Sequence, residues 1–338
     1  ITLNGTESRL HPVRGTRPLK NFLSINPENK KATRAAFGET LVRVGETHPN
    51  VVVLDADLSV STKSSAFAKK FPARFFQMGI AEANMIGTAA GLALSGKIPF
   101  LCSFGCFITG RFETIRISIG YNQANVRMIG THSGLGIGED GYTQMALEDM
   151  ALMRSLPGMG VLQPADPKET EKMIEYLAEH HRGPVYVRLT RQNVSQLFND
   201  HYEFHYGQGV ILKEGKDLAL LATGSVVYNS YLAAGLLDRE GISTTVVNIH
   251  TIKPLDESLV LELSKTHKTL VTVEDHNVIG GLGTAVAEVL ASAGASVRQL
   301  RLGVHDVYGE SGSAEALYEK YGLSADKIFH ECLQFYRR

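Results

Sequence analysis

One acidic residue stands at the start of an almost entirely apolar segment. Glu82 is followed, up to residue 93, almost only by small and apolar residues such as Ile86, Ala89 and Leu92. A helix of this composition can pack closely on nearly every face, so we expect it to be buried. Burial disfavours a carboxylate, raises its pKa and makes the protonated form available as a hydrogen-bond donor near neutral pH. Glu82 is therefore a candidate catalytic acid; the alternative is an ordinary first-turn acid that is stabilised by the helix dipole.

A glycine-rich segment is the second candidate site. Residues 131–141 contain four glycines together with His132 and Asp140. The segment directly follows a predicted strand, which places it at the carboxyl edge of a sheet, where ligands of α/β folds bind. Its glycines permit backbone conformations and close approaches that other residues block. The alternative is a flexible surface turn.

These candidates depend on the strands and helices that position them. From Asn26 onward, strand-like apolar runs alternate with helical stretches, which predicts two consecutive parallel-sheet α/β domains. We expect an amino-terminal arm at 1–25, a first domain at 26–191, a polar and irregular linker at 192–209 and a second domain at 210–338. The predicted strands are 51–54, 75–77, 98–103, 126–130, 161–163 and 185–188, then 218–222, 244–247, 269–274 and 297–302. Besides the Glu82 helix, the predicted helices are 31–48, 107–119, 147–155 and 167–180, then 226–239, 256–266 and 283–293, followed by two short ones.

Composition excludes several classes of function. The 338 residues are 43% hydrophobic and have a formal net charge of −1, so nucleic acid is not an expected partner. The chain has no run of eighteen apolar residues and no apolar signal region near its start, which predicts a cytoplasmic protein. Cys102, Cys106 and Cys332 are an odd number of cysteines, without a second cysteine pair or a histidine at zinc-finger spacing, so a disulfide framework or a structural zinc site is not expected and we expect reduced thiols.

Two strings in the sequence resemble the transketolase family: Gly-Ile-Ala-Glu, ending at Glu82, and Gly-Glu-Asp-Gly, ending at Gly141. The resemblance implies a thiamine diphosphate pyrimidine-binding domain followed by a transketolase-type C-terminal domain. It also implies that Glu82 binds the aminopyrimidine ring of thiamine diphosphate and activates this cofactor. In the same way, Phe107 is expected to stack on the ring, Phe104 to line the same slot and Asp57 to lie beside the cofactor. For the two aromatic residues the alternative is ordinary core packing.

The resemblance also implies a set of substrate contacts. His132 is expected near donor oxygens or phosphate, and Asp140 is expected to accept a hydrogen bond from a ketose hydroxyl. Arg34, Arg191 and Ser61 match the phosphate-binding positions of the family. Guanidinium groups bind phosphate through paired hydrogen bonds, so these residues suggest a phosphate clamp. The alternative for each arginine is a solvated surface position.

One candidate substrate residue departs from the family pattern. Gln144 stands where the best-known members have a histidine. Its amide can bind a sugar hydroxyl or carbonyl, but it cannot carry a proton near pH 7. Proton transfer is therefore expected to depend on His132, on the cofactor's aminopyrimidine or on a partner chain.

The resemblance covers the rear half of a full transketolase. The family binds its metal through a Gly-Asp-Gly segment with a downstream asparagine, and this sequence contains no such segment. We therefore assign no metal ligand to this chain and expect a second chain to supply the diphosphate domain with magnesium or calcium. The expected assembly is a heterotetramer, with two copies of this chain at its core.

The expected activity is transfer of a two-carbon ketol unit from a ketose phosphate to an aldose phosphate, as in the pentose phosphate pathway. One alternative is a 2-oxo acid dehydrogenase β subunit, which is also a separate chain with a Gly-Ile-Ala-Glu string. Another is a non-catalytic transketolase-like partner subunit. The turn at Gly281 and Gly283 could suggest dinucleotide binding, but Val286 occupies the third glycine position, so we favour a turn that packs a helix on its sheet.

Overall fold

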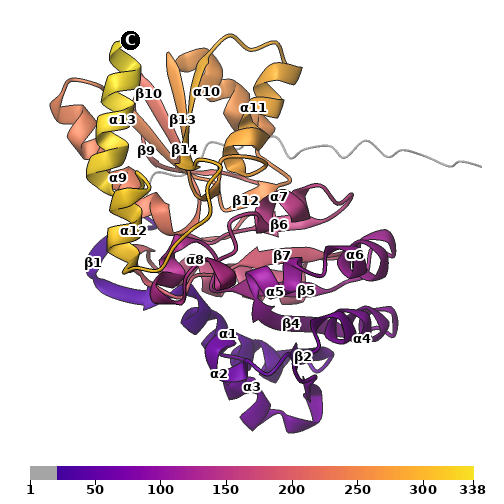
Figure 1. Ribbon diagram of the computed structural model, residues 1–338. Helices are drawn as coiled ribbons and strands as arrows, with labels where there is room; N and C mark the ends of the chain where they lie inside the picture. The colour runs from indigo at the N-terminus through magenta and orange to yellow at the C-terminus, as the bar shows by residue number, and fades with distance from the viewer. Residues whose placement is uncertain (1–20) are drawn as a thin grey trace, which may run out of the picture.

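A computed structural model describes residues 21–338 of the chain. The chain forms two stacked α/β units, of which the first lies at the bottom of Figure 1 and the second, in orange and yellow, at the top. Each unit contains a mainly parallel sheet with helices packed beside it. The predicted fold class, two consecutive parallel-sheet α/β units, is confirmed. The predicted arm at 1–25 lies mostly outside the described residues.

The first unit is built on a seven-stranded sheet with the order β12-β6-β7-β5-β4-β2-β3. The strands that it contributes itself are β2 (Val51–Asp55), β3 (Phe75–Gln77), β4 (Ile98–Phe104), β5 (Arg127–Thr131), β6 (Gly160–Leu162) and β7 (Val185–Arg188). These six strands are parallel, and all but the edge strand β3 are almost completely buried. Their carboxyl ends therefore meet at one edge, where the following loops can form a ligand site.

The helices of the first unit mostly agree with the prediction. They are α1 (Thr33–Thr47), α2 (Ser59–Thr62), α3 (Ser65–Lys70), α4 (Glu82–Leu94), α5 (Gly105–Thr109), α6 (Phe112–Thr114), α7 (Asp149–Arg154) and α8 (Pro167–Glu179). Short 3₁₀ segments are η1 (Pro72–Arg74), η3 (Leu135–Asp140) and η4 (Tyr142–Gln144). The single helix predicted at 107–119 is wrong, because the backbone leaves helical geometry at Arg111 and continues as α6 and the π-helical η2 (Ile115–Tyr121).

The second unit contains a five-stranded sheet with the order β14-β13-β10-β11-β9. Its strands are β9 (Val210–Lys213), β10 (Leu218–Ala222), β11 (Thr244–Asn248), β13 (Thr269–Asn277) and β14 (Arg298–Val304). Its helices are α9 (Val227–Arg239), α10 (Glu257–Thr266), α11 (Leu282–Ser292), α12 (Ala314–Lys320) and α13 (Ala325–Arg337), with the 3₁₀ segment η5 (Gly224–Val226). α13 packs against α9, whereas α12 lies between the units and contacts η3 (Figure 1).

Two connections differ from the prediction. The segment expected to be an irregular linker contains β8 (Asn193–Phe198), which pairs antiparallel with β1 (Leu23–Ala32). β8 is stabilised because the buried carboxylate of Asp166 accepts hydrogen bonds from the amides of Leu197 and Phe198. In addition, β12 (Thr251–Lys253) leaves the second unit and pairs antiparallel with β6 of the first. The two units therefore share one sheet.

A buried polar cluster also joins the two units. Glu169 of α8 accepts hydrogen bonds from Asn248 of β11 at 2.8 and 3.0 Å and from the hydroxyl of Tyr202 at 2.5 Å. It also accepts one from the amide of Ala165. Burial raises the pKa of Glu169 to about 7, while these donors oppose the shift. The cluster ties α8 to both the second unit and the segment after β8.

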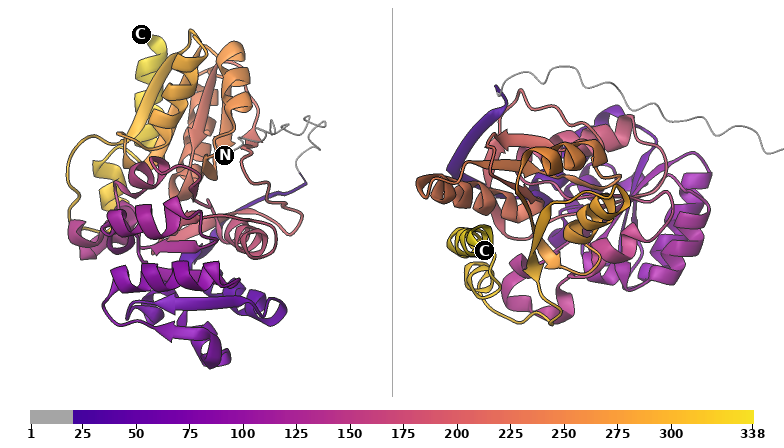
Figure 2. Two further views of the ribbon diagram at one scale, coloured as in Figure 1. Left: turned by 90° about the vertical axis from the view of Figure 1, so that its right-hand side faces the viewer. Right: turned by 90° about the horizontal axis from the view of Figure 1, so that it is seen from above.

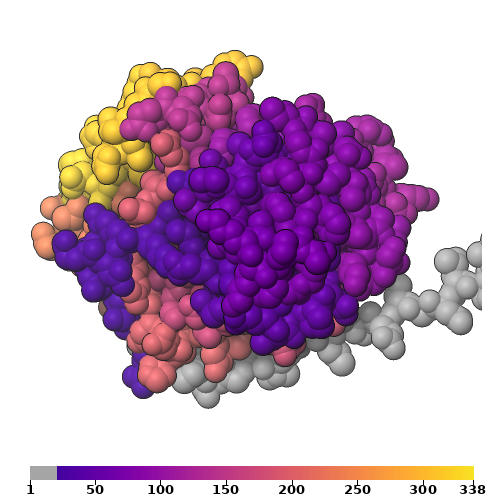
Figure 3. Space-filling model, turned by 90° about the horizontal axis from the view of Figure 1, so that it is seen from below, coloured from indigo at the N-terminus to yellow at the C-terminus, as the bar shows by residue number. Residues whose placement is uncertain are grey.

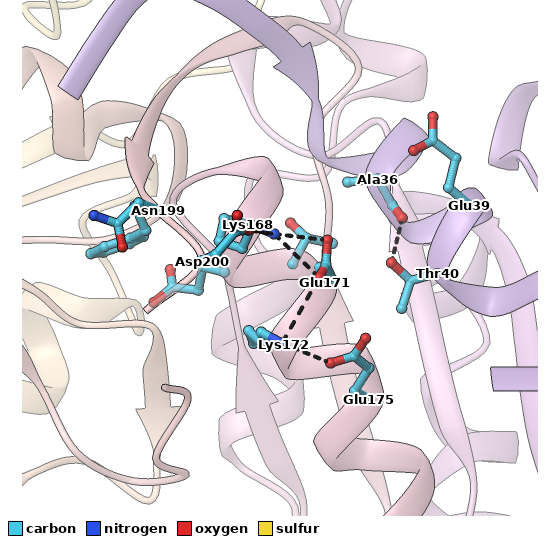
Figure 4. A network of polar contacts seen from close by, with 12 residues as sticks. Ala36, Glu39, Thr40, Lys168, Glu171, Lys172, Glu175, Asn199 and Asp200 are labelled. Carbon is cyan, nitrogen blue, oxygen red and sulfur yellow. Dashed lines mark hydrogen bonds and ion pairs between the residues drawn. The ribbon is translucent and has the colours of Figure 1, made fainter. Parts of the chain in front are cut away.

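The outer edge formed by α1 and α8 is charged but balanced. On α8, Lys168 and Lys172 pair with Glu171 and Glu175 at spacings of three residues or fewer, and α1 lies opposite (Figure 4). Arg43 of α1 approaches Glu171 and Glu175 at 3.4 and 3.6 Å. Exposed ion pairs of this kind contribute about 0–1 kcal/mol each. This edge has charges of both signs and thus no clear preference for an anionic or cationic ligand.

The helix that begins at Glu82 is buried on one side only. Met85 and Ile86 are completely buried, whereas Gly87, Gly91 and Leu94 are exposed. The prediction that this helix is buried on nearly every face is therefore wrong for the single chain. Apart from Asn84, its outer face is nevertheless made of small and apolar residues, which is unusual for a surface exposed to water.

The views from other directions agree with this arrangement. The two units lie one above the other in the left view of Figure 2, which is turned by 90° about the vertical axis. The first unit forms most of the face seen from below (Figure 3). Within residues 21–338, no helix has the length and apolar character needed to cross a membrane. All three cysteines are free thiols, as predicted.

Candidate active site

Most of the predicted site residues lie at the carboxyl edge of the first sheet. Asp57 follows β2, Phe104 ends β4, His132 follows β5 and Arg191 follows β7. β2, β4, β5 and β7 include the neighbouring strands at the centre of the sheet, so the segments that follow them converge. Phe107 lies just beyond Phe104, on α5.

Three rings form a continuous stack at this edge. The rings of Phe104 and His132 are 3.8 Å apart between centroids and tilted by 26°. The rings of Phe104 and Phe107 are 5.4 Å apart and nearly parallel, at 12°. Phe104 and His132 are buried, whereas Phe107 is half-buried at the open end of the stack. The stack therefore presents one partly accessible aromatic face.

His132 is a neutral imidazole in this structure. Burial, followed by the charges of Arg34, Arg191 and Lys63, lowers its pKa to about 3. Its Nε2 lies 3.0 Å from Nη1 of Arg34, and its Nδ1 lies 2.8 Å from the hydroxyl of Thr131. A guanidinium can only donate, so Nε2 accepts from Arg34 and Nδ1–H donates to Thr131. Because the lone pair of Nε2 is already engaged, this geometry favours a binding role over proton transfer.

Arg34 links His132 to the loop after β2. Its Nη1 also donates to the carbonyl oxygen of Ser61 at 2.7 Å, whereas its Nε–H has no acceptor among residues 21–338. Burial lowers the pKa of Arg34, and the charge of Arg191 lowers it further. Three cations, Arg34, Arg191 and Lys63, thus surround a neutral imidazole, and a bound anion would relieve their mutual repulsion.

A buried acid that the sequence analysis missed organises the loop after β2. Asp55 accepts hydrogen bonds from the amide of Leu58 at 2.7 Å and from the hydroxyls of Thr62 and Ser64 at 2.7 and 2.9 Å. Burial raises the pKa of Asp55, and these donors oppose the shift. The available signal was an acid at the end of an apolar strand, followed within ten residues by several hydroxyl side chains.

The same loop holds Asp57 in a sparsely populated backbone conformation. Asp57 is exposed and has a φ of 64°, and its amide donates to the side chain of Gln77 at 2.7 Å. Residues held in the left-handed region without being glycine are often found at ligand sites, because the surroundings must stabilise the strain. Ser61, three residues further on than Leu58, is half-buried and contributes its carbonyl oxygen to Arg34.

Arg191 is bound to the glycine-rich segment. It donates to the carbonyl oxygen of Ile137 at 2.6 Å and lies 3.5 Å from the carboxylate of Asp140 and 3.6 Å from that of Glu139. Gln144, in η4, is half-buried, and its backbone carbonyl oxygen accepts a hydrogen bond from the Cys106 thiol at 3.2 Å. Asp140 thus adjoins the arginine cluster, and Gln144 adjoins the helix that contains Phe107.

Glu82 is buried but has no partner from the described part of the chain. Its exposed fraction is 6%, and within residues 21–338 no group donates a hydrogen bond to its carboxylate. No hydrogen bond or ion pair connects it with the other predicted site residues in this range. The contacts therefore join Arg34, Ser61 and His132 to the aromatic stack, and Arg191 to Asp140. None of them includes Glu82.

Two further observations concern other ligands. Within the described residues, no group of three or more His, Cys, Asp or Glu side chains could hold a metal ion. At the start of α11, the carboxylate of Glu274 accepts hydrogen bonds from the amides of Leu282 and Gly283 at 2.7 and 2.8 Å. A protein carboxylate thus occupies the position where a dinucleotide phosphate would bind, which agrees with the preferred interpretation of this glycine turn.

Comparisons with known proteins identify relatives of both units. Residues 29–196 match the family described as transketolase, pyrimidine binding domain, and residues 207–328 match transketolase, C-terminal domain. A protein of Methanocaldococcus jannaschii, provisionally named a transketolase C-terminal section, is 46% identical over 88% of this chain and 94% of its own length. The 6-deoxy-6-sulfo-D-fructose transketolase subunit SqwH of Clostridium sp. (strain MSTE9) is 40% identical over 87% of this chain and 91% of its own length.

A solved structure supports the same relationship. The structure described as "Split gene transketolase, inactive beta4 tetramer" is 48% identical to this chain and superposes with a TM-score of 0.82. The match covers 88% of this chain and 96% of that one. This similarity extends through both units, including their arrangement.

We expect His132 to stay neutral in the folded chain from about pH 5 to pH 8, because burial and nearby cations lower its pKa to about 3. Since the unfolded chain binds this proton first, the shift also reduces stability as the pH falls below about 6.5. Imidazole ¹⁵N NMR measures the ionisation, with His132→Asn to assign the signal and the exposed His305 as a reference. A protonation midpoint of His132 between pH 6 and 7 would show that burial and the nearby cations do not act on this imidazole as described.

Proposed function

The chain belongs to the transketolase family, and we propose that it is one subunit of a two-chain transketolase. The proposed reaction moves a two-carbon ketol unit from a ketose phosphate to an aldose phosphate. The observation that supports this best is the joining of Arg34, Ser61 and His132 to the aromatic stack, with Arg191 and Asp140 beside them. Membership of this family implies dependence on thiamine diphosphate.

The residues of this chain fit the ring part of that cofactor. Glu82 is a buried carboxylate that lacks a hydrogen-bond donor from the described residues, and Phe107 offers a partly accessible aromatic face. When bound, thiamine diphosphate supplies the nucleophilic carbon that takes up the two-carbon unit. We propose that Glu82 holds a ring nitrogen, that Phe107 stacks on the aminopyrimidine, and that Phe104 and Asp57 border it.

The diphosphate and its metal are proposed to lie mainly on a partner chain. The described residues contain no cluster of three potential metal ligands. Two relatives that match nearly the whole of this chain are named as a section or a subunit of a transketolase, which suggests a separate chain with the remaining domain. Magnesium or calcium would suit an oxygen-rich site formed with a diphosphate.

The arginine cluster is proposed to bind the acidic end of the sugar. Arg34 and Arg191 would contact this group together with Ser61, and Asp140 and Gln144 would bind sugar hydroxyls. An anion there would be balanced by cations that now repel one another. A relative that acts on a sulfonated sugar suggests that a sulfonate is a second possible anion beside phosphate. A 2-oxo acid has a carboxylate but no phosphate or sulfonate, so the two arginines favour transketolase over a 2-oxo acid dehydrogenase β subunit.

His132 is proposed to position Arg34 and the substrate without carrying the proton. Its Nε2 accepts from Arg34, and its Nδ1–H donates to Thr131. This pairing holds the ring at a fixed orientation against Phe104. In this arrangement His132 helps to orient the substrate and to exclude water, and burial together with the surrounding cations lowers its pKa and keeps its imidazole neutral.

The outer face of α4 is proposed to bind a second copy of this chain. Ile80, Leu94 and Tyr121 are 84, 66 and 84% exposed, and a side chain added at Gly87 or Gly91 would meet no atom within 4 Å. The small residues would let another helix approach closely, while the large ones would lose their contact with water. The split-gene relative of known structure is described as a tetramer of β chains, which supports self-association through such a face.

The isolated chain should show no ketol transfer with thiamine diphosphate and magnesium, and activity should appear when the partner with the diphosphate domain is added. In the complex, Glu82→Gln should lower kcat roughly 10²- to 10⁴-fold, because the amide cannot exchange a proton with the ring nitrogen. Steady-state assays with xylulose 5-phosphate and ribose 5-phosphate measure this. Glu113→Gln, which alters another first-turn acid, is the control. Full turnover by Glu82→Gln would remove the proposed role, and turnover by the chain alone would contradict the two-chain model.

Arg191→Gln should raise KM for phosphorylated donors about 10- to 100-fold, since a charge-assisted hydrogen bond contributes about 1.5–3 kcal/mol. The KM of a non-phosphorylated donor such as hydroxypyruvate should change much less. Arg43→Gln alters an arginine at the charged edge of α1 and is the matched control. An equal rise in KM for both kinds of donor would mean that Arg191 acts only by holding the glycine-rich segment through Ile137, and not as part of an anion clamp.

Gly87→Glu should prevent self-association without unfolding the chain. The added side chain meets no atom within 4 Å in the single chain, and replacing a mid-helix glycine stabilises a helix by up to about 1 kcal/mol. Sedimentation velocity at several concentrations measures the assembly. Gly235→Glu on α9 is the matched control, because that position is also open. If Gly87→Glu assembles as the unaltered chain does, the interface lies elsewhere.

A further inference from the structure

A carboxylate of the second unit is inserted beneath the glycine-rich segment of the first. Asp275, at the end of β13, is completely buried. Its Oδ1 accepts a hydrogen bond from the amide of Leu135 at 2.8 Å, and the amide of Gly136 also donates to it. These amides start η3, which ends at Asp140. The backbone at the base of the segment is therefore held by a residue from the other unit.

The close packing at this contact leaves no room for a side chain at two of the glycines. Gly134 has a φ of 84°, and a Cβ there would lie 2.2 Å from Oδ2 of Asp275. A Cβ at Gly136 would lie 2.0 Å from Nε2 of the Gln192 side chain. Both glycines are required because the peptide backbone lies directly on these two polar side chains.

Tyr318 of α12 connects the two polar side chains. Its hydroxyl donates to Oδ2 of Asp275 at 2.8 Å and accepts a hydrogen bond from Gln192 at 2.5 Å. The hydroxyl of Ser225, 2.7 Å away, completes its contacts. Gln192 directly follows Arg191, so one buried hydroxyl is linked both to the start of η3 and to the neighbour of the proposed anion-binding arginine.

Hydrogen bonds also join the start of this segment to the residues that follow it. Gly134 donates its amide hydrogen to the carbonyl oxygen of Ala146 at 3.0 Å. Arg188, paired with the buried Asp149, donates to that same oxygen at 2.7 Å and to the carbonyl oxygen of Asp275 at 2.8 Å. The two ends of residues 134–146 are thus fastened together, and the part exposed between them includes Asp140.

We propose that Asp275 and Tyr318, which belong to the second unit, are positioning residues. They set the geometry of the glycine-rich segment of the first unit. They do not touch the reacting atoms. They fix the start of η3 and the side chain of Gln192, and so determine where Asp140 and Arg191 lie relative to the aromatic stack. The proposal rests on the proposed function for the substrate roles of Asp140 and Arg191, whereas the structural connection itself does not.

The cleanest test is Tyr318→Phe in the full chain, alone and with its partner subunit. It removes one hydroxyl and no ring, so the fold should remain. Tyr202→Phe is the matched control, because the hydroxyl of Tyr202 also donates to a buried carboxylate, that of Glu169, away from the segment. Hydrogen exchange of residues 131–141 is measured on the chain alone, and kcat and KM are measured on the complex with xylulose 5-phosphate and ribose 5-phosphate.

We expect Tyr318→Phe to speed exchange in residues 131–141 about tenfold or more, since a hydrogen bond to a charged group is lost. It should lower kcat/KM roughly 10- to 100-fold, with a higher KM and a lower kcat, because the contacts to substrate are displaced. Tyr202→Phe should leave both quantities unchanged. Asp275→Asn, which keeps the shape but not the charge, should reproduce the pattern of Tyr318→Phe.

Unchanged exchange in Tyr318→Phe would overturn the proposed connection. Faster exchange with unchanged kcat/KM would overturn the positioning role, and so would equal kinetic losses in Tyr202→Phe. If the unaltered complex shows no ketol transfer at all, the proposed function fails. The exchange measurement on the chain alone would still decide whether the second unit holds the segment.

Discussion

The buried guanidinium of Arg188 is the interaction on which the junction of the two units depends. Burial by itself would lower the pKa of Arg188, but Asp149 and Asp275 outweigh it and raise the pKa. An unpaired charge at this depth would cost several kcal/mol, so β7, the start of α7 and the end of β13 must stay together. The same guanidinium binds the carbonyl oxygens of Ala146 and Asp275. Charge compensation therefore fixes the ends of the strands before any ligand is considered.

That constraint helps to explain why polar side chains can be held in fixed positions at this edge of the sheet. The side chains with proposed roles stand on short segments, and most are held by buried partners that have no role of their own. Asp55 holds the loop of Asp57 and Ser61, and Thr131 orients His132. A site on loops is usually mobile, but loops whose backbone amides bind buried carboxylates lose that freedom. The Arg34–His132 pair is held by other partners, namely the carbonyl oxygen of Ser61 and the hydroxyl of Thr131.

Local patterns in the sequence predicted most of the fold. The strands at 75–77, 185–188 and 218–222 agree with β3, β7 and β10 to the residue, because apolar runs between turn residues are local signals. β1, β8, β9 and β12 were missed because their pairing depends on partners elsewhere in the chain. Asp275 lies 140 residues from Leu135, so no spacing rule could join them. The sequence likewise could not show which face of α4 is covered, since small and apolar residues occupy both.

The exposed face of α4 and the unpaired carboxylate of Glu82 belong to the same physical problem. Glu82 begins this helix, and its apolar outer side starts within two residues, at Ile80. A single chain would leave that apolar surface in water, which is unfavourable. Under the proposed assembly, a second copy covers the helix and the cofactor ring supplies a partner to Glu82. The proposed cofactor contact and the proposed subunit contact thus lie on the same helix, so cofactor binding and subunit association should favour each other.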